Sequence, residues 1–243
     1  MTTRRAQPSP GGTTSGWILL DLDGPLLDVL PRYHRLHRDV VLWRHGRPLD
    51  AAEYWQAKRR RVPEAGILER TGLDELAISQ AAARRARWIE SRRYLSLDRT
   101  WPWTQEALGA LACFGPLVVV TLRRHRARLL WQLRGLGLRH RFHRIISGPG
   151  DDSPEAKALL LRGAGLPIPP GSVLVGDTEV DVASGKALGL GTVALSCGIR
   201  SADALAAWQP DVLLADLREV ADHLLSLGWQ QRAPDAGLAR ARA

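Results

Sequence analysis

The chain has 243 residues, of which 45% are hydrophobic and 24% are charged, which is enough for one sizeable core or a core with a small second domain. It carries 34 basic and 25 acidic residues, a formal net charge of +9, and two cysteines. Two cysteines exclude a disulfide framework and indicate a reducing, cytoplasmic location. The absence of an apolar run near the ~18 residues that a membrane span needs excludes a membrane-embedded class.

The positive charge is carried almost entirely by arginine, because Lys58, Lys157 and Lys186 are the lysines of the chain. A cationic surface attracts anions, including phosphorylated metabolites and nucleic acids. We do not expect nucleic acid as a partner, because the sequence lacks a zinc-ligand spacing, an RNA-binding aromatic signature and a basic heptad array. Residues 1–16 are polar, without the apolar region of a secretory signal, and we interpret 1–16 and 229–243 as disordered tails.

Short apolar runs alternate with helical patterns along most of the chain. The runs lack polar alternation, which is typical of strands buried on both faces of a parallel sheet. This order predicts a doubly wound, Rossmann-like α/β core. The expected strands are 17–20, 117–120, 144–147, 172–175, 191–195 and, more weakly, 211–214. The expected helices between them are 123–136, 154–164, 179–188 and 216–226.

One long connection, residues 25–116, separates the first expected strand from the second. A loop of that length is implausible in a compact domain, and the segment has helical patterns throughout. We therefore expect a small all-helical cap domain over one end of the sheet, as residues 29–103, with a core of 17–28 and 104–228. The expected helices of the cap are 29–45, 50–61, 64–70 and 73–95.

Acidic residues gather where the first expected strand ends, in the stretch ILLDLDGPLLD. Asp21 and Asp23 are two residues apart, so on an extended segment their side chains face the same side. Gly24 permits a turn or a close backbone approach. Two carboxylates about 4 Å apart repel by roughly 1 kcal/mol in water and roughly 4 kcal/mol at an effective dielectric near 20, so their clustering favours a cation between them. Oxygen ligands suit Mg²⁺.

Four further residues support a metal and phosphate site at this sheet edge. Asp177 and Asp181 follow another expected strand in VLVGDTEVD, and two strand ends that carry acids can converge on one metal. Thr121 directly follows LVVV, where its hydroxyl can donate to a phosphate oxygen. Lys157 lies near the start of the 154–164 helix and can neutralise phosphate and nucleophile.

In order along the chain, Asp21-Leu22-Asp23-Gly24, Thr121, Lys157 and Gly176-Asp177…Asp181 match the four motifs of the haloacid dehalogenase-like hydrolase superfamily. The chain resembles this superfamily from about residue 17 to 226, and the long connection occupies the position of its helical cap. Residues 209–226 resemble the C-terminal strand and helix of the phosphoglycolate-phosphatase-like members.

The resemblance implies a Mg²⁺-dependent phosphatase that hydrolyses a small phosphorylated metabolite. Asp21 would attack phosphorus and form an aspartyl-phosphate, while Asp23 would protonate the leaving oxygen and later activate water. Thr121 and Lys157 would hold the phosphoryl oxygens. The metal ligands would be Asp21, Asp23 through its backbone carbonyl, Asp177 and Asp181, the last directly or through water. The presence of Asp23 favours phosphoryl transfer over carbon–halogen cleavage, because the dehalogenase branch lacks this residue.

Two residues depart from the pattern of the superfamily. Pro25 stands where Thr or Val is common and fixes the backbone of the turn, and Leu122 replaces a frequent Asn or Ser. Neither change removes a catalytic group.

The sequence leaves several alternatives open. Lys58 and Arg59, in the KRRR stretch 58–61, are the candidates for contacting the rest of an anionic substrate, although charge runs are usually solvated helix faces. We expect His34 and His37 at the surface, because no third metal ligand accompanies them. A phosphomutase acting on a sugar phosphate, or a non-catalytic binding protein with this fold, remain alternatives, as do a monomer and a homodimer.

Overall fold

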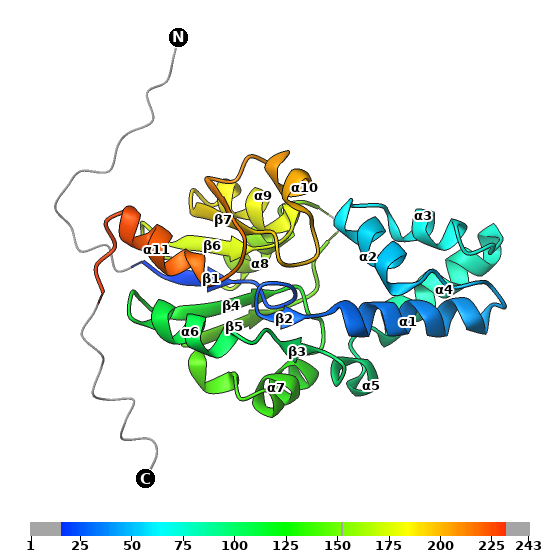
Figure 1. The fold of residues 1–243 in the computed structure, drawn as a ribbon. Helices are drawn as coiled ribbons and strands as arrows, with labels where there is room; N and C mark the ends of the chain where they lie inside the picture. Colours follow the sequence, from blue (N-terminus) through cyan, green and yellow to red (C-terminus); the bar gives the residue numbers. More distant parts are fainter. Residues whose placement is uncertain (1–15, 152, 232–243) are drawn as a thin grey trace.

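The computed structural model describes residues 16–151 and 153–231 and contains a six-stranded parallel sheet with the order β5-β4-β1-β6-β7-β8 (Figure 1). The central strand β1 (Ile18–Leu20) pairs on one side with β4 (Leu117–Thr121) and on the other with β6 (Val173–Gly176). The outer strands are β5 (Arg144–Ser147), β7 (Gly191–Leu195) and β8 (Val212–Leu214).

Both faces of the sheet are apolar and covered, which explains the unalternating apolar runs. Ile18 and Leu20 pack on one face and Leu19 on the other, each with 0% exposure. The first face is covered by α6 (Thr104–Ala112), α7 (Arg126–Gly135) and α11 (Glu219–Ser226). The second is covered by α8 (Ala156–Gly163), α9 (Glu179–Ala187) and α10 (Ala202–Ala206). The predicted doubly wound α/β class is confirmed.

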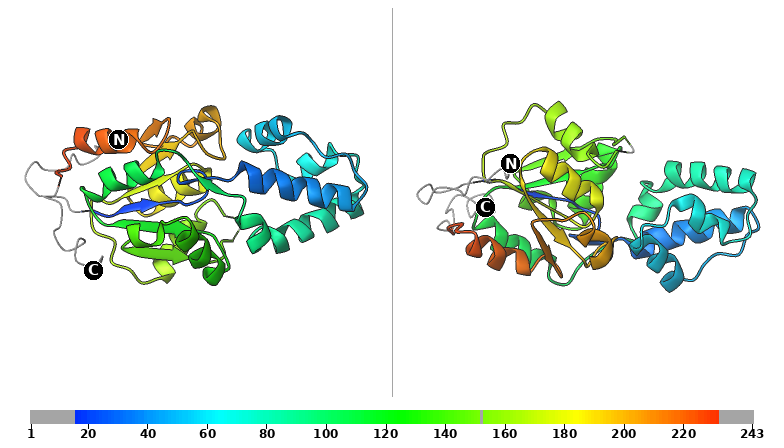
Figure 2. Two further views of the ribbon diagram at one scale, coloured as in Figure 1. Left: turned by 60° about the horizontal axis from the view of Figure 1, so that its bottom comes forward. Right: turned by 90° about the horizontal axis from the view of Figure 1, so that it is seen from above.

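Five helices between residues 30 and 95 form a body at one end of the sheet, which we call the helical insertion (Figures 1 and 2). It has its own apolar core, in which Leu36, Val40 and Leu68 are at most 1% exposed. The side chains of Asp50 and Asp74 cap two of its helices by accepting backbone N–H groups. The helices are α1 (Leu30–Trp43), α2 (Ala51–Arg59), α3 (Glu64–Glu69), α4 (Glu75–Trp88) and α5 (Arg92–Leu95). The domain division at residues 28/29 and 103/104 stays a prediction.

The two connections between the insertion and the sheet pair with each other. β2 (Leu27–Asp28) and β3 (Arg99–Thr100) form a two-stranded antiparallel ribbon. Two residues per strand are too few to give a hydrophobic pattern, so the sequence did not predict this ribbon. The ribbon holds both ends of the insertion at the edge of the sheet that carries Asp21.

Several sequence-based boundaries need correction. The helix predicted over 123–136 begins at Arg126, and the one predicted over 73–95 is two helices, interrupted at 89–91. The short helix α10 was not predicted. Trp229, assigned to a tail, is 5% exposed and packs in the core. The tail predictions for 1–15 and 232–243 lie outside the described residues. None of the helices described is both long and apolar enough for a membrane span.

Candidate active site at the carboxyl edge of the sheet

The chain changes direction across the sheet at β1, which makes the carboxyl end of this strand a crevice. After β1 the chain runs outward through β4 and β5, then returns to the other side of β1 as β6. In open parallel sheets, ligands bind outside the carboxyl ends of the strands at such a switch point. Asp21 follows β1 directly, Thr121 ends β4, and Asp177 follows β6.

Three carboxylates from two strand ends meet at this point. Asp21, Asp177 and Asp181 are 6%, 0% and 1% exposed, and one oxygen of each lies within 4.8 Å of the others. The Oδ1 atom of Asp177 is buried without a hydrogen-bond partner. A buried carboxylate oxygen that lacks a donor is costly unless a cation occupies the space beside it. The donor set is therefore suited to a hard cation such as Mg²⁺.

The raised pKa values of the clustered carboxyl groups also favour a cation at this site. Burial, reinforced by the charges of Asp181 and Asp23 and opposed by Lys157, raises the pKa of Asp21 to about 7. Burial, together with Asp21 and Asp181, also raises the pKa of Asp177 well above its usual range. A bound divalent cation would reverse both shifts, because it favours the ionised carboxylates.

Lys157 is the cation that the structure places within this cluster. Its Nζ lies 2.6 Å from Asp21 Oδ1 and 2.5 Å from Asp181 Oδ1, and its side chain is 4% exposed. The other oxygen of Asp181, Oδ2, accepts from the backbone N–H and the hydroxyl of Thr178 in a capping box at the start of α9. Asp181 is thus fixed by the helix cap and by Lys157, with Asp21 on the other side of the ammonium group.

Glycines leave the space that Asp177 occupies. A Cβ atom at Gly24 would lie 1.9 Å from Asp177 Oδ2, and a Cβ atom at Gly198 would lie 2.0 Å from the same oxygen. Gly24 also has a φ of +106°, which side chains other than glycine rarely adopt. The glycine of the first motif is therefore needed on two counts, its backbone conformation and the approach of a carboxylate from β6.

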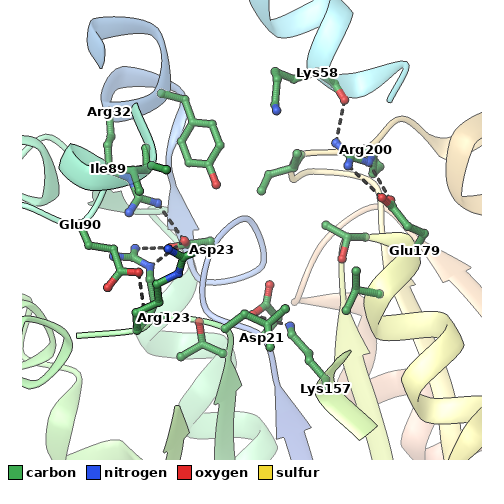
Figure 3. A pocket seen from close by; sticks show the side chains of 18 of the residues that line it. Asp21, Asp23, Arg32, Lys58, Ile89, Glu90, Arg123, Lys157, Glu179 and Arg200 are labelled. Atoms are coloured by element: carbon green, nitrogen blue, oxygen red, sulfur yellow. Dashed lines mark hydrogen bonds and ion pairs between the residues drawn. The ribbon is translucent and has the colours of Figure 1, made fainter. Parts of the chain in front are cut away.

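The side chain of Asp23 is turned away from the acidic cluster and lies between two arginines (Figure 3). Arg32 of α1 donates to Asp23 Oδ2 at 2.8 Å, and Arg123 donates to both carboxylate oxygens, at 2.8 Å and 2.5 Å. Burial alone would raise the pKa of Asp23, but Arg123 and Arg32 hold it well below its usual range. Asp98, with a side chain that is 0% exposed, lies against both arginines.

A cavity of about 390 Å³ lies between this sheet edge and the helical insertion. In Figure 3, Asp21 and Lys157 form its floor, Asp23 and its arginines one side, and Lys58 points into it from α2 above. Thr121 and Leu122 also line it. The remaining lining residues are Tyr33, Arg85, Ala86, Ile89, Glu90, Arg124, Thr178, Glu179, Val180, Ile199 and Arg200.

The insertion contributes a wall with more positive than negative charge. Lys58 and Arg85 both line the cavity, and both form ion pairs with Glu64, at 3.3 Å and 3.1 Å respectively. Glu64 itself does not line the cavity. Burial, with the charge of Arg85, lowers the pKa of Lys58 to about 8 against the attraction of Glu64. Two cations thus share one carboxylate that stands behind them, and the pair retains a net positive charge at neutral pH.

The structure brings most of the sequence-predicted residues together and places one elsewhere. Asp21, Thr121, Lys157, Asp177 and Asp181 converge on the floor of the cavity or directly beneath it. Arg59, predicted as a substrate contact with Lys58, is not among the lining residues. Its guanidinium instead donates to two backbone carbonyls of the core.

Four charged residues that line the cavity were not predicted from the sequence: Arg32, Arg85, Glu90 and Arg123. The only available signal was Arg123, two residues after Thr121. Arg32 and Arg85 lie on helices and Glu90 lies in the break between α4 and α5, and the orientation of these segments toward the cavity depends on the tertiary fold. Glu90 accepts the backbone N–H groups of Arg124 and His125, each at 2.9 Å, and so joins the insertion to the loop after β4.

The predicted surface position of His37 is wrong. It was expected at the surface but is 0% exposed, where its Nε2 accepts the backbone N–H of Leu49 and its ring stacks on Tyr54 at 4.6 Å. Its paired position with His34 gave no indication of this, because helical spacing alone does not say which face is buried.

Comparison with known proteins agrees with this geometry. A family model described as haloacid dehalogenase-like hydrolase matches residues 17–189. The chain is 31% identical over 233 residues to a phosphoglycolate phosphatase of Pseudomonas syringae pv. tomato, covering 90% of this chain and 83% of that protein. A second one, from Pseudomonas syringae pv. syringae, is 30% identical with the same coverage. A haloacid dehalogenase-like family protein of Streptococcus pneumoniae has the same fold, with a TM-score of 0.70 at 22% identity, covering 88% of this chain and 100% of that one. The four motifs, the parallel sheet and the match over most of the length lead to one conclusion: the chain belongs to the haloacid dehalogenase-like hydrolase family.

Proposed function

We propose that the protein is a Mg²⁺-dependent phosphatase that hydrolyses a small phosphorylated metabolite through an aspartyl-phosphate on Asp21. The observation that carries this proposal is the convergence of Asp21, Asp177, Asp181 and Lys157 on one end of a cavity. The similarity to phosphoglycolate phosphatases supports the same reaction class.

In the first step, an oxygen of Asp21 forms a bond to phosphorus while the bond from phosphorus to the ester oxygen breaks. Lys157 and Thr121 would hold the phosphoryl oxygens, the first with a buried ammonium group and the second with a hydroxyl at the end of β4. In the second step, water attacks the same phosphorus and releases phosphate, which restores the Asp21 carboxylate.

The metal would be held by Asp21, Asp177 and the backbone carbonyl of Asp23, with Asp181 bound directly or through water. It would supply positive charge that lets an anionic nucleophile approach an anionic phosphate. Asp177 is the strongest of these ligands on structural grounds, because its buried Oδ1 has no other partner.

We propose Asp23 as the acid and base of the reaction. Its two arginine partners affect both roles, because they change how readily Asp23 holds a proton. In the arrangement described, the charges of Arg32 and Arg123 favour ionised Asp23, which is the form that accepts a proton from water in the second step. Protonation of the leaving oxygen in the first step requires that Asp23 gain a proton, so at least one arginine contact must weaken when substrate is bound.

We propose that the substrate has a second negative group, which Lys58 and Arg85 on the wall of the insertion bind. The two cations share Glu64, so their surplus charge can pair with an anion that enters the cavity. A cavity of about 390 Å³ suits a molecule of few atoms. Phosphoglycolate, the substrate in the names of the relatives, is such a molecule and is the first compound to test.

We expect the enzyme to work in the cytoplasm as a monomer or homodimer, without a nucleic acid or membrane partner. The thiols of Cys113 and Cys197 are free, which suits a reducing compartment.

The test is the release of inorganic phosphate from phosphoglycolate, ethyl phosphate, an aryl phosphate and a sugar phosphate, with Mg²⁺ and with chelator. Metal-dependent release that Asp21→Asn lowers by about 10³-fold or more supports the proposal. An Asp21→Asn protein with undiminished turnover would refute the nucleophile. Isomeric sugar phosphates without free phosphate would favour the mutase, and no turnover across the panel would favour a binding protein.

A further inference from the structure

Arg59 is the last residue of α2 and makes two hydrogen bonds across to the core. Its Nη1 donates to the carbonyl of Gly198 at 2.7 Å and its Nη2 to the carbonyl of Ser196 at 2.9 Å. Both carbonyls lie in the segment that follows β7, which we call the 196–200 loop. A planar guanidinium can bridge two carbonyls in this way, whereas an ammonium group has no such fork.

The 196–200 loop and the residue after it also donate back to the same turn of α2. The backbone N–H of Ser201 donates to the carbonyl of Arg59 at 3.0 Å, and Arg200 donates to the carbonyl of Lys58 at 2.9 Å. The last carbonyls of a helix have no i+4 partner within the helix. The carbonyl of Lys58 also accepts the N–H of Arg61 in the turn that ends α2, and Arg200 adds a second donor from the core. The end of α2 is therefore completed by the core, and its docking depends on where this loop lies.

The same loop also holds the carboxylate of Asp177. The backbone N–H of Ile199 donates to Asp177 Oδ2, and the Cα of Gly198 packs so near that a Cβ atom would lie 2.0 Å from that oxygen. The second oxygen, Oδ1, is buried without a partner. Because the carboxylate is planar and rigid, the loop that fixes Oδ2 also decides where Oδ1 points.

We propose that Arg59 is a positioning residue. When the helical insertion docks on the core, Arg59 fixes the 196–200 loop, and this loop orients the metal-binding carboxylate of Asp177. The connection is continuous: Arg59 holds Gly198, and the next residue, Ile199, holds Asp177. This inference rests on the proposed function, which places Mg²⁺ at Asp177. It assigns Arg59 a role different from the substrate contact expected from the sequence.

The coupling must act in both directions, because a linkage between two equilibria is reciprocal. If docking of α2 improves the metal site, then Mg²⁺ improves the docking of α2. The amide of Ser201, which donates to Arg59, reports on docking without any need for turnover.

The experiment is calorimetric titration of Mg²⁺ into the full chain, compared with hydrogen exchange at Ser201. We expect Arg59→Gln to lower the Mg²⁺ affinity about tenfold, within the range of such couplings, and to abolish the protection of Ser201 by Mg²⁺. Arg59→Lys keeps the charge but not the planar pair of N–H donors. It should therefore show most of the same loss of Mg²⁺ affinity and of the protection of Ser201. Arg60→Gln is the matched control, because Arg60 is the next residue and is exposed.

Two outcomes separate this inference from the proposed function. A wild-type protein that binds no Mg²⁺ would overturn the metal site and this coupling together. A wild-type protein that binds Mg²⁺, with unchanged affinity in folded Arg59→Gln and Arg59→Lys, would overturn the coupling alone. An equal loss in Arg60→Gln would also overturn it, because the effect would then follow from surface charge.

Discussion

Arg32, in the first turn of the helical insertion, donates to Asp23 at the edge of the sheet over 2.8 Å, and its side chain is 1% exposed. The contact joins the acid and base candidate of the core to the part of the chain that covers it. Asp98, just before the returning connection, pairs with the same guanidinium at 3.1 Å. The place where the insertion leaves the sheet is therefore a buried ion network, and Asp23 is part of it.

Replacement of Arg32 tests this network. Loss of one partner from a buried ion pair costs about 3–5 kcal/mol, and Asp23 keeps Arg123, so we expect Arg32→Gln to lower the free energy of unfolding by about 2–3 kcal/mol. We also expect a loss of turnover, because Asp23 is no longer fixed from the insertion. Urea unfolding and phosphate release measure the two effects. The matched control is Arg35→Gln, which breaks an exposed pair with Asp39 on the same helix and should cost below about 0.5 kcal/mol. Equal losses in the two variants would contradict the role of the network.

Gly24 should be irreplaceable for metal binding rather than for folding. A methyl group there would overlap Asp177 Oδ2 at 1.9 Å, so Gly24→Ala must displace the carboxylate or the turn. We expect the Mg²⁺ affinity and turnover to fall by about 10²-fold or more, since a displacement of about 1 Å in a catalytic group can have that effect. Gly72→Ala is the control, because Gly72 also has a positive φ, +76°, but has open space around it. It should lose stability but retain Mg²⁺ affinity, and the same loss of affinity in both variants would show that backbone strain alone is responsible.

The pKa of Lys58, lowered to about 8 by burial and by Arg85, predicts a pH dependence of substrate binding. Lys58 is charged below that pH and loses its charge as the pH rises through it. The KM for phosphoglycolate should therefore rise above pH 8, by about tenfold for a lost charged hydrogen bond. The KM for ethyl phosphate, which has no second charge, should not follow this curve. In Lys58→Arg the rise should vanish, because arginine stays charged. Parallel KM curves for both substrates in the wild type would exclude Lys58 from the substrate site.

The sequence predicted the sheet and the floor of the site because both depend on local patterns. Strand ends at Asp21, Thr121 and Asp177 follow from apolar runs, and the crevice follows from the order of strands and helices. The side chains that the insertion contributes could not be predicted. Arg85 and Arg59 belong to charged helices with little pattern, and the packing of the insertion against the sheet decides that the first enters the cavity while the second contacts the core.

Asp23 shows the same limit within a motif. Its spacing from Asp21 predicted two carboxylates on one side, but Arg32 and Arg123 attract its side chain away from the acidic cluster. Arg123 lies 100 residues from Asp23, and Arg32, nine residues from it, lies on a helix whose orientation depends on how the insertion packs, so the spacing of the motif indicates neither contact. The backbone position of Asp23 was predictable, and the electrostatic surroundings of its carboxylate were not.

His37 predicts how the stability of the protein depends on pH. Burial, with the charges of His34 and Arg85 and against that of Glu64, lowers the pKa of its imidazole from 6.5 to about 4. Between these values the unfolded chain binds a proton at His37 and the native protein does not, so the stability that His37 contributes falls as the pH falls. The total loss is about 3 kcal/mol, and most of it is reached at pH 4.5.

The comparison of wild type with His37→Gln isolates this contribution. Glutamine can still accept the N–H of Leu49 with its side-chain oxygen but does not titrate. Asp21 and Asp98 have raised pKa values and shift stability in the opposite sense, but both proteins share them, so their effect cancels in the difference. Urea unfolding at pH 7 and pH 4.5, followed by tryptophan fluorescence, should show that wild type loses about 2–3 kcal/mol more than the variant on acidification. An equal loss in both proteins would mean that His37 takes up its proton in the native state, which is incompatible with an imidazole buried between Leu49 and Tyr54.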